Sequence, residues 1–441
     1  MTLAIAFQFA VVLAAIWMGA RYSGIGLGLW GAVGLAVLVV AFGVNPTSPP
    51  IDVMLIILAV IMAASVMDAA GGIDFLVRVA ERIIRANPKY VTIVAPLTTW
   101  SFTFVAGTGH IVYPLLPVIY ETAHQSGIRP ERPMAVATIA SQQAITASPV
   151  AAATAAMIGL FSEKGLAQWG LPQILMICVP ATLTGVLAAA IVSMFVGKDL
   201  EDDPEYQARL KAGAIPAPKP AGQRPPLAPA AKISAWIFLA GVALVVVFGF
   251  FPELRRLPGA KSPLAMPLVI EIVMLSVAAV MLLLTGVKVD DVPKTPTLRA
   301  GVVAVIGIFG LAWLGDSFIA ANQNVIVPAI GNMTQAAPWT FAIGLFFASV
   351  LLYSQAATTR ALMPLGVALG IPPQFLIASF PSVNGYFFIP TYGSLIAAIN
   401  FDLSGTTRIG RYVLNHSFMI PGLVATCGAV ATGLLLARTI Y

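Results

Sequence analysis

Apolar runs long enough to cross a lipid bilayer recur along the whole chain of 441 residues. They cover residues 4–20, 24–43, 53–72, 91–123, 134–160, 171–197, 233–251, 265–287, 300–314, 338–353, 374–400 and 414–438. The runs are continuous and do not alternate with period two, which argues against a β-barrel. Because one helical span needs about 20 apolar residues, the pattern predicts an all-α polytopic membrane protein with roughly 10–12 transmembrane helices.

One long polar segment, residues 198–232, divides the chain nearly in half. Its Pro/Ala-rich part, 214–231, is expected to be extended and poorly ordered. We therefore predict three parts: an N-terminal transmembrane repeat over 1–197, this linker, and a C-terminal transmembrane repeat over 233–441. The linker is expected to be dispensable for the chemistry of the protein.

A second polar stretch, 74–89, has basic residues at helical spacing. Arg78, Arg82 and Arg85 recur at i, i+4 and i+7, and the opposite face is predicted to hold Leu76, Val79 and Ile83. This pattern is typical of an amphipathic helix on the membrane surface. The positive-inside rule places it in the cytoplasm.

Composition narrows the class of protein further. Only 10% of residues are charged, against about 25% in soluble chains, and the net charge of +6 is ascribed to cytoplasmic loops and not to nucleic-acid binding. The two cysteines, Cys178 and Cys427, form neither a disulfide framework nor a zinc spacing. The first basic residue is Arg21, so the first run is predicted to be a retained span and not a signal peptide.

Two similar polar motifs interrupt the apolar runs at a single offset. They read Ser141-Gln142-Gln143-Ala144-Ile145-Thr146 and Ser354-Gln355-Ala356-Ala357-Thr358-Thr359. Ser141 and Ser354 lie 213 positions apart, as do Trp100 and Trp313. Pro149 and Pro364 follow the motifs, so neither helix is expected to continue undisturbed. Repeats that each contribute one broken helix to a midplane site are typical of secondary transporters, and we expect the motifs to meet.

The amides and hydroxyls of such breaks can bind an anion with the help of helix N-termini. The alternative is that small residues merely let membrane helices pack closely. A further break is predicted where Gly107-Thr108-Gly109 precedes His110, and another over 386–394. The candidate substrate-binding residues are Thr108, Gly109, Ser141, Gln142, Thr146, Ser148, Ser354, Gln355, Thr358, Thr359 and Arg360.

Two charged residues are further candidates, Arg360 beside the second motif and Asp316 in the stretch Trp313-Leu314-Gly315-Asp316. Arg360 directly follows the second motif, and an arginine within a membrane run is costly and usually functional. Its guanidinium suits bidentate binding of a carboxylate, although it could also snorkel to an interface. Asp316 is the candidate for a coupling ion, with helix capping as the alternative.

Several chemistries have no sequence support. The chain contains neither a Walker A sequence nor His-Glu-x-x-His, and these motifs carry ATP hydrolysis and zinc protease activity. No catalytic residue, cofactor or metal site is predicted. Transport would therefore be secondary, and a polytopic sensor subunit that binds without flux is the alternative.

The motifs together resemble those of one family. They include Gly19-Ala20-Arg21, Ala70-Gly71-Gly72-Ile73-Asp74, Asn87-Pro88-Lys89-Tyr90, Ala106-Gly107-Thr108-Gly109, Ile145-Thr146-Ala147-Ser148-Pro149, Ala312-Trp313-Leu314-Gly315-Asp316, Leu352-Tyr353-Ser354-Gln355-Ala356-Ala357-Thr358, Ala361-Leu362-Met363-Pro364 and Gly405-Thr406-Thr407-Arg408-Ile409-Gly410. Over nearly its whole length the chain resembles the anaerobic C4-dicarboxylate transporters (Dcu family) of bacterial inner membranes. Relatives carry Lys where Arg360 stands and Asn where His110 stands.

The resemblance implies uptake, exchange or efflux of fumarate, succinate, malate or aspartate across the inner membrane, as in fumarate respiration. It also implies a fold like that of the ion-transporter superfamily, with two inverted repeats and paired re-entrant helices. The expected partners are the dicarboxylates and the lipid bilayer, without nucleic acid. A homo-oligomer and a sensor kinase partner are left open by the resemblance, and so is coupling by exchange or by protons.

Overall fold

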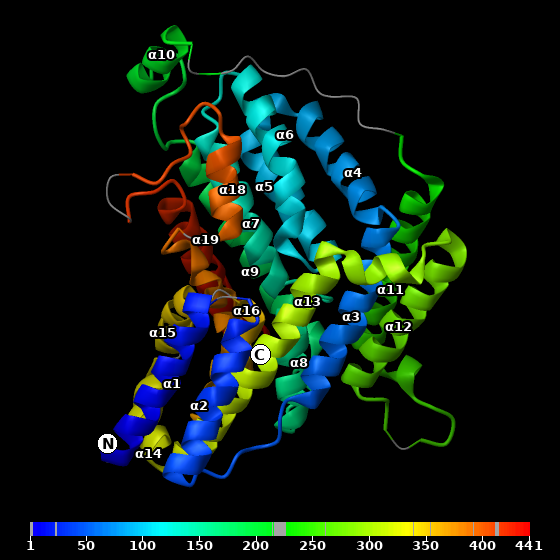
Figure 1. Ribbon diagram of the computed structural model, residues 1–441, viewed down its shortest axis with the longest axis vertical. Coiled ribbons are helices and arrows are strands. Elements are labelled where there is room, and N and C mark those ends of the chain that lie inside the picture. The colour runs from blue at the N-terminus through cyan, green and yellow to red at the C-terminus, as the bar shows by residue number, and fades with distance from the viewer. Residues whose placement is uncertain are drawn as a thin grey trace.

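The computed structural model describes residues 3–22, 24–213, 215, 226–260, 262–337, 339–352, 354–390, 392–410 and 414–441. Over these residues the fold is all-α, as predicted, and the single β feature is an isolated bridge between Ile409 and His416. Figure 1 shows a bundle of helices of unequal length.

The first half of the chain contains α1 (Leu3–Tyr22), α2 (Gly26–Phe42), α3 (Ile51–Ala69), α4 (Gly72–Ala86), α5 (Val91–Ala106), α6 (Val112–Gln125), α7 (Glu131–Gln143), α8 (Ala152–Glu163) and α9 (Leu171–Ser193). A short helix, α10 (Pro204–Lys211), follows. The second half contains α11 (Pro229–Phe250), α12 (Met266–Thr285), α13 (Pro296–Gly307), α14 (Trp313–Ala336), α15 (Trp339–Leu352), α16 (Gln355–Ala368), α17 (Pro373–Ser379), α18 (Gly393–Phe401) and α19 (Met419–Ile440).

Six of the described helical stretches are long and apolar enough to cross a membrane. They are α3, α9, α11, α12, α19 and the continuous stretch Pro296–Asn322. Four shorter apolar helices lie within or coincide with α1, α2, α8 and α15. A chain with this many apolar helices is a polytopic membrane protein.

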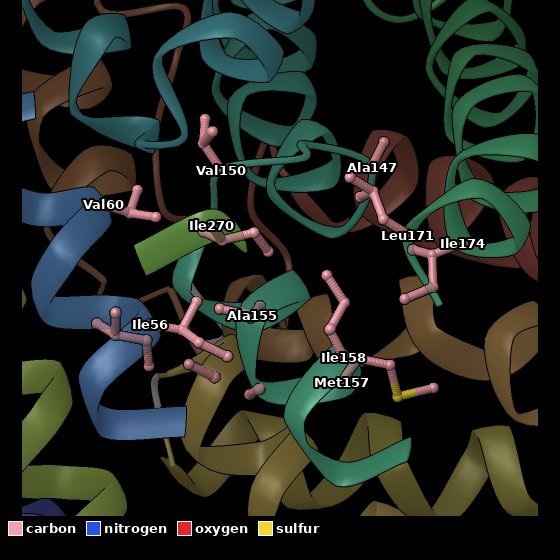
Figure 2. Close-up of a cluster of buried hydrophobic side chains, with 14 of the residues drawn as sticks. Ile56, Val60, Ala147, Val150, Ala155, Met157, Ile158, Leu171, Ile174 and Ile270 are labelled. Atoms are coloured by element: carbon pink, nitrogen blue, oxygen red, sulfur yellow. The ribbon is translucent and has the colours of Figure 1, made fainter. Parts of the chain in front are cut away.

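The two halves pack into one body. The largest hydrophobic core contains Ile56 of α3 and Ile158 of α8 together with Ile270 of α12 and Phe380. Figure 2 shows Ile56 and Val60 on α3 facing the side chains of α8, with Ile270 close by. Helix pairs α3–α12 and α9–α19 also pack across the halves, so the predicted repeats share their core.

The polar linker contains more regular structure than its composition predicted. Its expected extended part, 214–231, includes the first turn of α11, which begins at Pro229 because proline suits the first helical position. Residues 214 and 216–225 lie outside the described residues, so their predicted disorder stays a prediction.

The N-terminal part of the linker is docked on both halves through α10 (Figure 1, upper end of the bundle). Asp203 caps α10 and also pairs with the buried Arg129, which lies just before α7. On the other side, the Arg209 guanidinium donates to the Ser404 carbonyl oxygen at 2.9 Å. The linker segment around α10 thus ties the loop before α7 to the loop after α18.

The basic stretch forms α4, but its buried face differs from the predicted one. Leu76, Ala80 and Ile84 are buried, whereas Ile83 is 40% exposed. The reason is that α4 packs against α5, α6 and α11, which selects a face rotated by one residue. Arg85 also pairs with a carboxylate of α6 at 2.7 Å.

Glycine allows α2 to approach the π-helical segment η6 (Ile308–Ala312) backbone to backbone. A Cβ added to Gly310 would lie 1.7 Å from the carbonyl oxygen of Gly28. Close approach over small residues is a common way for membrane helices to associate. It holds α2 against the junction of α13 and α14.

Candidate functional site

The first polar motif ends a helix, as predicted. Helix α7 stops at Gln143, one 3-10 turn follows (η3, Ala144–Thr146), and α8 begins at Ala152. Pro149 lies in the irregular segment between them, where no backbone donor is needed. The amide groups of the first turn of α8 are therefore free of partners within the helix.

The second motif starts a helix, and the predicted effect of Pro364 is wrong. Ser354 caps α16, and its Oγ accepts a hydrogen bond from the Ala357 amide at 3.2 Å. The helix then passes through Pro364 to Ala368. Proline within a membrane helix is tolerated where neighbouring groups compensate for the lost hydrogen bond. Tyr353, just before the motif, lies outside the described residues.

The two motifs meet through a hydrogen bond between their glutamines. Gln355 Nε2 donates to Gln142 Oε1 at 2.8 Å across 213 residues, and it also approaches Asn384 Oδ1 at 3.2 Å. Asn384 Nδ2 donates to Gln143 Oε1 at 3.3 Å, and Gln143 Nε2 donates to Thr426 Oγ1 at 2.9 Å. The predicted approach is confirmed, and this chain of amides joins α7, α16, α19 and the 3-10 segment η7 (Phe380–Phe387).

The third predicted break contributes to the same place. Helix α5 ends at Ala106, and Gly107 takes a left-handed conformation with φ +70°. Thr108 Oγ1 then caps the short 3-10 helix η2 (Gly109–Ile111) by accepting from the His110 amide at 3.3 Å. A Cβ at Gly109 would lie 2.4 Å from Gln142 Nε2, so glycine is needed for the break to touch the glutamine pair.

The three breaks enclose a cavity of about 130 Å³. The first turns of α8 and α16 and the break after α5 form much of its wall, and the described residues of its lining include no Asp, Glu, Lys or Arg. Helix N-termini carry a partial positive charge, so the wall favours an anion. The lining residues are Gly107, Thr108, Gly109, His110, Tyr113, Gln142, Ile145, Ala152, Ala153, Ala304, Ser354, Gln355, Ala356 and Tyr392.

Five of the predicted site residues line this cavity: Thr108, Gly109, Gln142, Ser354 and Gln355. The other predicted hydroxyls lie outside the lining and bond within their own segments. Ser141, Thr146, Thr358 and Thr359 donate to backbone carbonyl oxygens three or four residues earlier, and Ser148 Oγ accepts from the Val150 amide. Their role in binding stays a prediction.

Arg360 and Asp316 are brought together, but they also lie outside this lining. The Arg360 guanidinium is buried and forms an ion pair with Glu163 at the end of α8. Its Nη2 is 3.5 Å from Asp316 Oδ2. Arg360 Nε and Nη1 and Asp316 Oδ1 have no hydrogen-bond partner in the described part of the chain. Binding of a substrate carboxylate by Arg360 and ion coupling at Asp316 stay predictions.

Sequence reasoning missed several residues of the site. Tyr113 and Tyr392 line the cavity, and Asn384 completes the amide chain. Glu163, the ion-pair partner of Arg360, ends an apolar helix and resembled an ordinary boundary residue. Two of these residues had a usable signal: Asn384 is an amide in the apolar run 374–400, which is itself an exception, and Tyr392 lies within the break predicted over 386–394.

The all-helical fold and the broken helices around a polar cavity define a polytopic membrane transporter. The family described as "Anaerobic c4-dicarboxylate membrane transporter" (DcuA_DcuB) matches residues 4–441. The chain belongs to this family. It is 40% identical over 439 residues to the anaerobic C4-dicarboxylate transporter DcuB of Escherichia coli O6:H1, and 42% identical over 433 residues to the C4-dicarboxylate transporter DcuA of Wolinella succinogenes. Each match covers 98% of both chains.

Solved structures support the fold. MtrF of Neisseria gonorrhoeae, from a study of antimetabolite efflux pumps, matches with a TM-score of 0.56 at 13% identity, over 92% of this chain and 85% of its own. The YdaH transporter of Alcanivorax borkumensis matches with a TM-score of 0.56 at 14% identity, over 99% of this chain and 97% of its own. The relatives are named as transporters and not as enzymes, and they lend no support to the sensor alternative.

Proposed function

We propose that this protein is a secondary transporter that exchanges C4-dicarboxylates, or takes them up with protons, across the bacterial inner membrane. Fumarate, succinate, malate and aspartate are the expected substrates. The substrate lies in the cavity between the broken helices, and the site residues are Thr108, Gly109, Gln142, Ser354 and Gln355.

The observation that carries this proposal is the meeting of both motifs at a cavity whose described lining residues include no anionic side chain. Gln142 and Gln355 bond at 2.8 Å, and the N-terminal turns of α8 and α16 line the same cavity. Two helix N-termini offer free amide donors and partial positive charge to carboxylate oxygens. A dianion that leaves water needs such fixed donors, because burying it without partners is prohibitive.

Cavity size supports a small substrate. About 130 Å³ is well below the roughly 300–1,000 Å³ of pockets for drug-sized ligands. The glutamine side chains can bind a carboxylate by their amide nitrogens and a hydroxyl or ammonium group by their oxygens. This versatility suits a site that accepts fumarate as well as malate or aspartate.

The test is exchange of labelled fumarate by purified protein in liposomes loaded with succinate. We expect saturable uptake that depends on internal succinate or on a proton gradient. Binding of fumarate without any flux would instead favour the sensor alternative.

A charge placed in the cavity tests the site itself. Gln355→Glu adds a carboxylate beside the bound dianion, and two charges 4 Å apart repel by about 4 kcal/mol at an effective dielectric constant of 20. We expect at least a tenfold rise in KM. The matched control is Gln125→Glu at the exposed end of α6, which should transport as the parent does.

A further inference from the structure

A second cavity, much larger than the first, adjoins the proposed substrate site. Its volume is about 910 Å³, and its wall includes α13 and the loop before it. The two cavities share five lining residues: His110, Ala304, Ser354, Gln355 and Tyr392. The larger cavity, which we call the vestibule, therefore borders the substrate cavity directly at the first turn of α16.

The vestibule is positively charged. Lys294 and Arg299 belong to its lining, and none of the described lining residues is Asp or Glu. Lys294 pairs with Asp291 at 2.8 Å on the exposed surface, so part of its charge is neutralised. Arg299, on the first turns of α13, is exposed and forms no ion pair with any described residue. An unpaired guanidinium in a concave site is available to an anion.

Arg299 lies on a helix that borders both the vestibule and the substrate cavity. It is on the same helix as Ala304, which lines both cavities. Among the described residues that line the substrate cavity there is no Lys or Arg, and the helix N-termini there supply partial positive charges that act over about one helical turn. A full charge in a cleft with low-dielectric walls acts over a longer distance and concentrates counter-ions there.

We propose that Arg299, assisted by Lys294, forms an outer binding site in the vestibule that captures the dicarboxylate dianion before it reaches the glutamine pair. This inference rests on the proposed function and assigns the capture step to residues outside the inner cavity. Arg299 then determines how fast the substrate arrives, and the inner site determines how it is held and carried across.

The experiment is the initial rate of fumarate exchange in proteoliposomes over a series of fumarate and salt concentrations. Removal of a steering charge acts on encounter, so Arg299→Gln should raise KM by about tenfold at low salt, the lower end of steering effects. Its kcat should stay within about twofold of the parent, because a group that acts only before the inner site affects KM alone. Since salt screens exposed charges, the difference in KM between the parent and Arg299→Gln should disappear at high salt.

Two variants serve as controls. Arg299→Lys retains the charge and should stay close to the parent in KM and in its response to salt. Arg438→Gln removes the same charge from an exposed position on α19 outside both cavities and should change neither. If Arg299→Gln transports fumarate with the KM and salt response of the parent, the outer site is refuted and the proposed function stands. If the parent itself shows no fumarate flux, both proposals are refuted.

Discussion

Removal of the positive charge at Arg360 should destabilise the protein strongly. The Arg360 side chain is 3% exposed and lies between Glu163, 28% exposed, and Asp316, 14% exposed. Arg360→Gln leaves two neighbouring carboxylates without their shared cation. Loss of one partner of a buried ion pair typically costs about 3–5 kcal/mol. The partial exposure of Glu163 places the expected loss at the lower end, about 3 kcal/mol.

The assay is thermal unfolding of purified protein in detergent, with a matched variant that removes all three charges. Arg360→Gln should lower Tm by several degrees. Combining it with Glu163→Gln and Asp316→Asn should restore most of the lost stability and raise Tm again, because no uncompensated charge is then buried. If Arg360→Gln melts at the temperature of the parent, or if the triple variant melts even lower than Arg360→Gln, the ion cluster does not stabilise the fold as argued.

The same melts test whether Arg360 holds a substrate carboxylate. Fumarate at 100 times its Kd stabilises the parent by about 2.7 kcal/mol. A tenfold loss of affinity in Arg360→Gln would reduce this to about 1.4 kcal/mol at the same concentration. An undiminished fumarate shift on top of a lowered Tm would show that Arg360 supports the fold and that the helix ends alone hold the carboxylates.

Three further predictions concern other parts of the molecule. Gly109→Ala should lower fumarate affinity at normal expression, because its Cβ would lie 2.4 Å from Gln142 Nε2. The control is Gly344→Ala, which has open space around it and should bind fumarate as the parent does. Thermal melts with fumarate measure both affinities. Burial alone would raise the pKa of Asp203, but hydrogen bonds from two α10 amides and from Arg129 lower it below its usual value. Because the pKa of Asp203 is lower in the folded state, the ionised carboxylate stabilises the docked α10 at pH values above the unfolded-state pKa. This stabilisation is lost as pH falls through the folded-state pKa, so hydrogen exchange of the α10 amides should rise only below about pH 4. Arg82→Cys, in a background without native cysteines, should react with an impermeant thiol reagent in inverted vesicles but not in intact cells if α4 is cytoplasmic.

The sequence was informative about the fold because membrane spans depend on length and composition alone. It also predicted three breaks correctly, at Gly107, before α8 and over 386–394, where η7 ends at Phe387 and α18 begins at Gly393, since glycine and proline act on the backbone locally. The prediction from Pro364 was wrong because its effect depends on the neighbours of α16, which the local sequence does not reveal. The rotated face of α4 is a similar case, decided by packing against three other helices.

The site was only partly predictable. A repeated Ser-Gln motif at one offset indicated that two distant segments meet, and the bond between Gln142 and Gln355 confirms it. The motif could not show which of its polar groups face a cavity, because hydroxyls on a helix can equally bond to the preceding turn, as at Thr358. Glu163 escaped notice because ion pairing across 197 residues leaves no local pattern.

One continuous helical element touches every part of the proposed transport path. The stretch Pro296–Asn322 contributes Pro296 and Arg299 to the vestibule and Ala304 to both cavities. It then passes through the π-helical turn η6 and continues to Asp316 in the ion cluster. A π turn inside an α-helix is frequent at functional sites, and here it separates the part that faces the substrate from the part that carries the carboxylate. Arg299→Gln and Arg360→Gln therefore perturb the two sides of this turn. Residues this far apart usually act additively, so a departure from additivity in the double variant would measure how strongly the helix couples substrate capture to the ion cluster.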